Sequence, residues 1–364
     1  MSVKQKGKSD NESANSSMSV RTGRECFRTL TTPEAVTLVS GADKVRASVP
    51  AGSKATADMV QTDEAFWTVF SFRFLSGAGF TRADCDAGLP HAVLSASIAR
   101  QLFGTTDVVG HTIQLNYVDY TVTGVVADVS MLATAAYAQI WVPYTAADAE
   151  SLSWRDDTMG PMHAVILAHS SADFDAIRKE TELLRQKYND GLRDVEIFYR
   201  GQPDTQLAYL YRRWYAEPDV PGVMLRYGIV IAILLLVPAV NLSGMTLSRM
   251  RRRMAEIGVR KAFGATGGEL MRQVFFENFV LTLLAGVVGL ALSYAATFLL
   301  NDFLFSNSMN AYLSGETALT PGMLLSPWAF IAAFAFCLLM NVLSAGIPAW
   351  RASRMNITDA INQR

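Results

Sequence analysis

The basic segment at residues 249–272 contains the side chains best suited to binding a partner. It holds seven Lys/Arg residues against two acids and joins two long apolar segments. A short loop with this excess of positive charge faces the cytoplasm in membrane proteins. Anchoring the topology is a sufficient role for the arginines at 251–253, but it does not account for the EIGVRKAFGAT string that follows. We therefore interpret residues 249–272, hereafter the elbow, as a docking surface for a cytoplasmic protein.

The spacing within the elbow predicts a helix, a turn and a second helix. A helical period continues from the preceding apolar segment as far as Ala262. Gly264 is able to adopt a positive φ and end that helix. Thr266 and Glu269 fit a capping box, with Thr266 as N-cap and Glu269 at the third helical position. The elbow is therefore expected to be an ordered connection.

Other kinds of chemistry have little support in the sequence. The four histidines are scattered and no Cys-x-x-Cys occurs, so no metal site is predicted. No nucleophile motif is present, which disfavours a membrane-anchored enzyme, and the aspartates beside Cys85 disfavour its thiolate. Cys337 lies in an apolar run, so only Cys26 and Cys85 could pair, and two unpaired thiols are expected. A net charge of −1 offers no bulk attraction for nucleic acid.

Three uncharged segments predict a membrane domain. No charge occurs at 227–248, 278–301 or 317–350, and about 20 apolar residues span a bilayer as a helix. We expect spans at about 227–248, 278–300 and 328–349. The elbow and the tail after residue 350 carry arginines, whereas residues 301–327 carry only two acids. The elbow is therefore expected inside the cell and the N-terminal domain outside it.

One face of the second span carries small residues at every fourth position. They are Ala285, Gly289, Ser293 and Thr297. Small residues allow membrane helices to approach closely, so we interpret this stripe as a helix-packing face. The alternative is that small residues are simply common in membrane helices.

The first 222 residues predict a water-soluble α+β domain after a disordered start. Residues 1–20 are polar and lack apolar periodicity, so they are expected to be disordered. Residues 21–222 alternate strand and helix patterns typical of two small α+β lobes. Expected helices are SIARQLFG, after Ser95 and before Gly104, and the segment at 171–188. Expected strands lie at 92–94, 112–117, 120–126, 139–142, 164–167 and 195–199, with a hairpin turn at residues 118 and 119.

The string PAVNLSGMTLSRMRRRMAEIGVRKAFGATGGELMRQVFFENFVLTLLAGVVGLALSY resembles the membrane domain of the FtsX/MacB-like permeases of ABC transporters. IPAWRASRMNITDAI resembles the C-terminal end of that domain. VQTDEAFWTVFSFRFLSGAGFT, HAVLSASIARQLFG and VVGHTIQLNYVDYTVTGVVADV resemble the MacB-type periplasmic core, in the expected order. The resemblance covers most of the chain, and EIGVRKAFGAT is its most specific part.

The resemblance implies the type VII ABC architecture and a role in coupling. The expected fold is an α+β extracytoplasmic domain (residues 21–222) followed by an all-α membrane domain (223–364) of three transmembrane helices in the inner (plasma) membrane. The chain would pair with an ABC ATPase subunit and a second permease copy or paralogue. It would hold no cofactor of its own, because ATP would be bound by the ATPase and no G-x-x-x-x-G-K-[S/T] occurs here. The residues that would couple to the ATPase are Glu256, Ile257, Gly258, Arg260, Lys261, Gly264, Ala265 and Thr266.

The sequence departs from the family in one respect and leaves the function open in another. The family's first span precedes the outer domain, and residues 1–20 are too short and polar to supply it. We expect a truncated start, the alternative being a helix from another chain. The expected function is export or extraction of a hydrophobic or amphipathic substrate. The alternative is a mechanotransmitter that regulates an envelope enzyme or sensor without transport.

Overall fold

A computed structural model describes most of the N-terminal part of the chain and selected parts of the rest. The described residues are 1–50, 52–130, 133–147, 149–212, 216–234, 236–237, 259, 263–264, 266–300, 328 and 330–340. They belong to two compact units. One contains Met1–Asp219 with Phe305–Ala318, and the other contains Val220–Leu304 with Leu319–Arg364.

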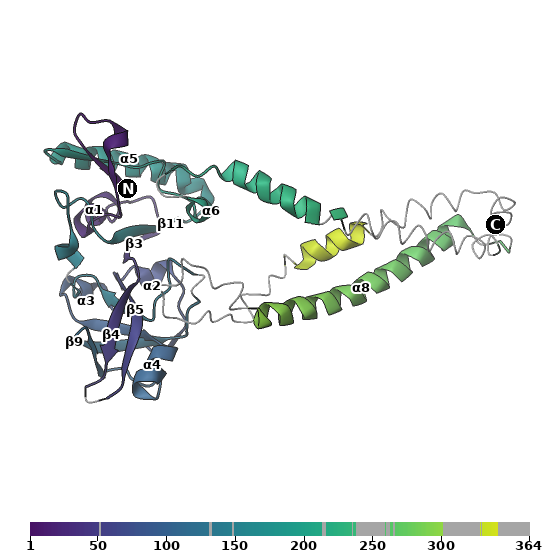
Figure 1. The fold of residues 1–364 in the computed structure, drawn as a ribbon, viewed down its shortest axis with the longest axis horizontal. Helices are drawn as coiled ribbons and strands as arrows, with labels where there is room; N and C mark the ends of the chain where they lie inside the picture. Colours follow the sequence, from purple (N-terminus) through teal and green to yellow (C-terminus); the bar gives the residue numbers. More distant parts are fainter. Residues whose placement is uncertain are drawn as a thin grey trace. The chain divides into compact units, whose positions relative to one another are not determined.

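The first lobe of the N-terminal unit is a curled sheet, called here the sheet lobe (residues 43–143; Figure 1). Its seven strands follow the order β6-β9-β7-β10-β5-β4-β8, and β8 also pairs with β9, so the sheet closes on itself. The strands are β4 (Asp43–Ser48), β5 (Lys54–Thr62), β6 (Phe74–Gly77), β7 (His91–Ser95), β8 (Thr112–Leu115), β9 (Val118–Val126) and β10 (Ile140–Pro143). Its helices are α2 (Phe66–Val69), α3 (Arg82–Asp86) and α4 (Ala96–Phe103). Fully buried Leu94, Ile98 and Ile113 lie in its core.

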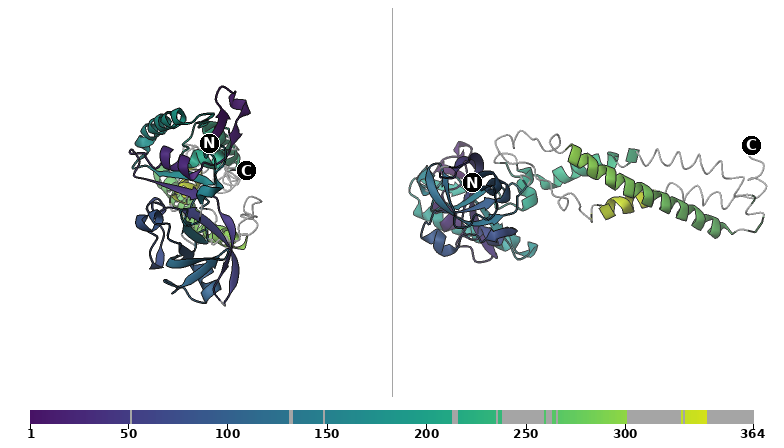
Figure 2. Two further views of the ribbon diagram at one scale, coloured as in Figure 1. Left: turned by 90° about the vertical axis from the view of Figure 1, so that its left-hand side faces the viewer. Right: turned by 90° about the horizontal axis from the view of Figure 1, so that it is seen from below.

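The second lobe, called the α5 lobe, is built from residues 2–40 and 149–211. One sheet has the order β12-β1-β2, and β11 pairs with β3. Its elements are β1 (Ser2–Gln5), η1 (Asp10–Glu12), β2 (Ala14–Asn15), α1 (Val20–Cys26), β3 (Ala35–Ser40), η2 (Ala149–Leu152), β11 (Met162–Leu167), η3 (Ser171–Asp173), α5 (Phe174–Gly191), β12 (Val195–Phe198) and α6 (Gln206–Tyr211). Figure 2 shows α5 on the side of this lobe that is away from the sheet lobe.

The two lobes share a hydrophobic cluster and a buried ion pair. Val39 of β3 packs with Phe66 and Trp141 of the sheet lobe. Arg28, which follows α1, donates from Nη2 to Glu64 Oε1 at 2.6 Å, and its Nε lies 3.7 Å from Asp63 Oδ2. The side chain of Asp63 is 1 % exposed. The contact between the lobes therefore combines apolar packing with the buried Asp63 carboxylate, whose charge is compensated by Arg28.

Several local predictions are confirmed by the structure. Ser95 caps α4 by accepting from the N–H of Ile98, and Gly104 ends that helix with φ 77°. The strands expected at 92–94, 139–142, 164–167 and 195–199 correspond to β7, β10, β11 and β12. The helix expected at 171–188 corresponds to α5. Cap residues and alternating apolar residues are local signals, which is why they could be recognised in the sequence.

The prediction of a disordered N-terminus is wrong. β1 pairs antiparallel with both β12 and β2, and Val3 is fully buried in the core of the α5 lobe. The Lys4 ammonium also lies 3.1 Å from the Glu196 carboxylate on the paired strand. The N-terminal segment is therefore ordered by pairing with β12, a strand almost 200 residues away in the sequence. Local composition cannot reveal such a distant pairing.

The predicted hairpin turn is misplaced. The turn between β8 and β9 lies at Asn116 and Tyr117, which have φ of 48° and 71°, and not at residues 118 and 119. The Asn116 Oδ1 also accepts the N–H of Arg46, at 3.0 Å, from the neighbouring strand. Asn tolerates positive φ and can fix a two-residue hairpin turn, but tyrosine at the second position concealed that signal.

Glu180 of α5 stabilises the turn that follows α1, and this contact predicts a pH-dependent loss of stability. Burial would raise the pKa of Glu180, but hydrogen bonds from the N–H and hydroxyl groups of Thr32 and Thr31 outweigh it and lower the pKa from 4.5 to about 2. Glu180→Gln should reduce the free energy of unfolding of the fragment 1–219 by about 1 kcal/mol at pH 7, after allowance for solvent screening.

The lowered pKa fixes the sign of this dependence. The ionised carboxylate stabilises the fold above its ordinary pKa of 4.5, and that contribution is lost as the pH falls towards 2. In urea titrations the difference between Glu180→Gln and wild type should therefore shrink below pH 4.5. Exposed Asp190 lies on the same helix, so Asp190→Asn serves as the control with little effect. A deficit that stays constant down to pH 3 would contradict this assignment.

Candidate coupling elbow

The structure describes the C-terminal part of the elbow. Of the eight predicted coupling residues, Gly264 and Thr266 lie among the described residues. Glu256, Ile257, Gly258, Arg260, Lys261 and Ala265 lie outside them. Their coupling role therefore remains a prediction.

Gly264 forms the turn of the elbow. The N–H of Phe263 donates to the carbonyl of Val259 at 3.1 Å, as in the last turn of a helix. Gly264 then has φ 93°, a region that favours glycine. Phe263 is 87 % exposed beside this turn. The expected helix-ending conformation at Gly264 is confirmed, and the turn presents an aromatic side chain to its surroundings.

A reciprocal capping box starts the second helix of the elbow. Both the N–H and the hydroxyl of Thr266 donate to Glu269 Oε2 at 3.0 Å, and the N–H of Glu269 donates back to Thr266 Oγ1 at 3.3 Å. Hydrogen bonds from the backbone and side chain of Thr266 lower the pKa of Glu269. This geometry confirms the predicted cap and fixes where the helix begins relative to Gly264.

The capped helix, α8 (Gly267–Leu299), is continuous over 33 residues. Among the described residues, Phe279–Ala296 is the one helical stretch that is long and apolar enough to cross a membrane. The whole of α8, with 33 residues, measures about 50 Å, compared with about 30 Å for the hydrocarbon core of a bilayer. Residues 267–278 therefore extend the helix by about 18 Å between the capping box and this stretch.

The family is decided by matches over both parts of the chain. Residues 2–184 match the MacB-like periplasmic core domain, and residues 228–357 match the FtsX-like permease C-terminal domain. The chain belongs to the FtsX/MacB-like family of ABC transporter permeases. The first match begins at residue 2, in agreement with the ordered strand β1.

Relatives of this permease include exporters that carry an ATP-binding part. The chain is 26 % identical over 298 residues to the pyoverdine export ATP-binding/permease protein PvdT of Pseudomonas aeruginosa, covering 81 % of this chain and 41 % of PvdT. It is 24 % identical over 332 residues to the ABC transporter permease YknZ of Bacillus subtilis, covering 89 % of this chain and 76 % of YknZ. The chain thus spans about two fifths of the length of PvdT. Against the solved periplasmic region of MacB from Actinobacillus actinomycetemcomitans, the identity is 18 %, coverage is 54 % of this chain and 86 % of that one, and the TM-score is 0.39.

The number of spans in this permease is only partly described. Besides the stretch in α8, the described residues contain the shorter apolar helices Val220–Leu234 and Phe330–Met340. The expected spans at 227–248 and 328–349 continue into residues outside the described ranges. Three spans therefore remain a prediction.

The α8 helix of the permease contacts the helix Phe330–Met340 through Gly286. A Cβ added to Gly286 would meet the Phe334 ring at 3.3 Å. On the same face Thr282 is buried, and Leu290 and Tyr294 are half-buried. This contact was not predicted from the sequence. Its residues on α8 recur at every fourth position, as those of the predicted small-residue stripe do: Thr282, Gly286, Leu290 and Tyr294.

The predicted small-residue stripe lies on a different face of α8. Ala285, Gly289 and Ser293 are exposed, a Cβ added to Gly289 would meet nothing within 4 Å, and the side chain of Thr297 is not described. Their role in packing remains a prediction.

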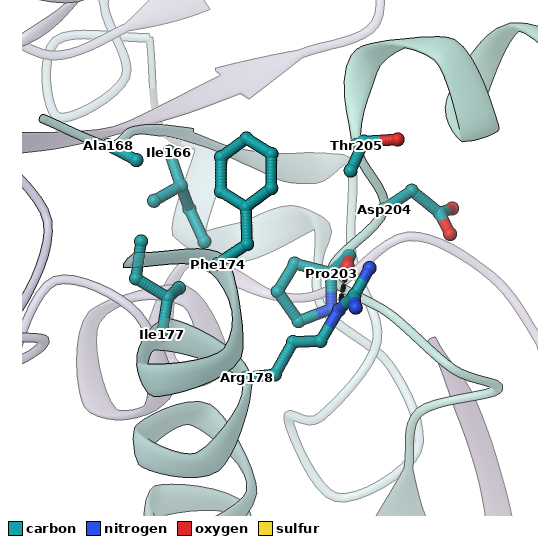
Figure 3. Close-up of a pocket in the computed structure, with 8 residues that line it drawn as sticks. All are labelled: Ile166, Ala168, Phe174, Ile177, Arg178, Pro203, Asp204 and Thr205. Carbon is teal, nitrogen blue, oxygen red and sulfur yellow. Dashed lines mark hydrogen bonds between the residues drawn. The ribbon is translucent and has the colours of Figure 1, made fainter. Parts of the chain in front are cut away.

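The α5 lobe of the permease contains a small, half-open pocket of about 50 Å³ that was not predicted (Figure 3). Its lining residues are Ile166, Ala168, Phe174, Ile177, Arg178, Pro203, Asp204 and Thr205. Figure 3 shows the Phe174 ring beside Ile166, and Arg178 Nε donates to the carbonyl of Pro203 at 3.3 Å. This volume is far below that of a typical ligand pocket, so no ligand is assigned to it. Its walls come from separate elements, so no local signal could have revealed it.

The buried cysteines of the permease are protonated at neutral pH. Cys26 and Cys85 are free thiols in separate hydrophobic clusters. Burial raises the pKa of each thiol to about 12, so both stay protonated and are poor nucleophiles.

Proposed function

We propose that this chain is the permease subunit of an ABC transporter and that it couples ATP hydrolysis by a separate ATPase subunit to export or extraction of a hydrophobic or amphipathic substrate. The observation that carries the proposal is the capped, continuous α8, which begins beside the Gly264 turn. A continuous hydrogen-bonded helix transmits a displacement at one end to the other. The elbow would be the point where the ATPase applies that displacement.

The membrane topology follows from charge. The elbow carries seven basic residues and would lie in the cytoplasm, while the N-terminal unit would lie outside the inner (plasma) membrane. Three spans would connect these parts. Phe263, exposed at the turn, would add an apolar contact to the charged docking surface.

Two partners would bind this chain, one at the elbow and one on α8. The ATPase would bind the predicted coupling residues, and a second permease copy or paralogue would pack on the small-residue stripe of α8. The relative named for pyoverdine export supports outward movement of the substrate. The outer domain would respond to the motion of α8 and act on that substrate.

Labelling in intact cells tests the topology on which this proposal depends. Thr266→Cys should react with a membrane-impermeant maleimide only after the cells are lysed. Tyr117→Cys, at a residue 78 % exposed on the outer domain, should react in intact cells. Both variants should carry Cys337→Ser, because Cys337 is exposed and the other two cysteines are buried. Reaction of position 266 from outside would overturn the proposal.

A further inference from the structure

The short helix α6 presents apolar side chains outward just before the membrane domain. Leu207 is 44 % exposed, Tyr209 53 % and Leu210 64 %, whereas Ala208 is buried in the domain. The helix carries no charged residue. An isolated exposed leucine is ordinary, but three large apolar residues on one turn and a half of helix form a contiguous apolar surface.

The rest of the domain fixes the orientation of α6. Thr205 caps the helix by accepting the N–H of Ala208 at 3.2 Å. Just after the helix, Arg212 is held by the Asp204 carboxylate, with Nη2 to Oδ1 at 2.7 Å, and both side chains are less than a tenth exposed. Arg212 also donates to the carbonyls of Arg200 and Ala216, each at 2.9 Å. Figure 3 shows Asp204 and Thr205 at the start of the helix. The apolar face therefore points outward because the structure holds it there.

A short stretch of chain links α6 to the first apolar helix of the membrane domain. α6 ends at Tyr211, and the helix Val220–Leu234 begins nine residues later. An extended chain of that length reaches at most about 30 Å. Trp214 and Tyr215 occupy this stretch of the sequence. Tyrosine and tryptophan are the residues enriched at the headgroup level of a bilayer.

We propose that α6 lies in the outer lipid–water interface and anchors the outer domain to the membrane surface. Leu207, Tyr209 and Leu210 enter the headgroup region, with the helix axis along the membrane plane. This inference rests on the membrane placement proposed above. It adds a second attachment for the outer domain besides the chain connection itself.

Spin-label accessibility in the full chain tests the anchor. Single cysteines at 210, 183 and 287, each with Cys337→Ser, carry a nitroxide in nanodiscs of phosphatidylethanolamine and phosphatidylglycerol. Leu183 is the matched control, because it is 65 % exposed and lies on α5 among charged residues. Val287, 60 % exposed on α8, reports the lipid interior. The ratio of oxygen to nickel-chelate collisions at 210 should exceed that at 183 severalfold and fall below that at 287.

Each other outcome overturns the inference in a distinguishable way. A ratio at 210 equal to that at 183 places α6 in water. A label at 210 shielded from both reagents places it against protein, such as a second copy of this chain. In both cases a lipid signal at 287 leaves the membrane placement intact. A water signal at 287 overturns that placement and the anchor together.

Discussion

Replacing Gly264 with proline is expected to abolish ATP-driven transport while the outer domain stays folded. Gly264 has φ 93°, and proline fixes φ near −65°, so the turn between the two helices of the elbow cannot form. The ATPase activity of the reconstituted complex should fall to the level measured without the permease. Gly264→Ala should have an intermediate effect, because alanine bears a strain of about 1–2 kcal/mol at a positive φ.

Gly268 provides the matched control for this series. It lies four residues on, inside α8, and a Cβ added there would meet nothing within 4 Å. Gly268→Ala should therefore leave transport unchanged and slightly favour the helix. Stimulated ATPase activity should decrease in the order wild type, Gly264→Ala, Gly264→Pro. Full activity of Gly264→Pro would show that the turn has no part in coupling.

Arg28→Met is expected to destabilise the outer domain by about 2–3 kcal/mol, because it leaves the buried Asp63 carboxylate without its cation. Asp63 Oδ1 accepts the Thr37 hydroxyl at 2.7 Å, and Oδ2 accepts the N–H of Leu38 at 3.0 Å. Those two hydrogen bonds do not offset the cost of burying the charged carboxylate. Burial raises the pKa of Asp63 even with Arg28 present. Urea unfolding of the fragment 1–219 measures the loss.

The pH dependence and two further variants separate this explanation from a general packing defect. Asp63 protonates more readily without Arg28, so the deficit of Arg28→Met should be largest at neutral pH and shrink as the pH falls. Arg28→Met with Asp63→Asn should lose less than the two single changes together. Arg21→Met removes a half-exposed pair with Glu25 and should change stability by less than about 1 kcal/mol. A deficit independent of pH would contradict the role given to Asp63.

Local signals made part of the fold and of the elbow predictable. Ser95 with Gly104, and Thr266 with Glu269, are caps whose donors and acceptors lie within a few residues, and the structure contains both. The order of β1 and the pairing of β8 with β4 depend on strands distant in sequence. The Gly286 contact depends on the separate helix that contains Phe334. These features need the tertiary fold, which periodicity alone does not specify.

The ladder between β1 and β12 determines how the outer domain responds to mechanical load. Its antiparallel register places Ser2 opposite Phe198 and Gln5 opposite Val195. Forces that draw residues 2 and 198 apart would peel the ladder one pair at a time, whereas forces that drive both in the same direction leave it intact. The domain is therefore suited to move as a rigid body about a single attachment point. The β1–β12 ladder would be the first part to open if the two ends of the domain were pulled in opposite directions.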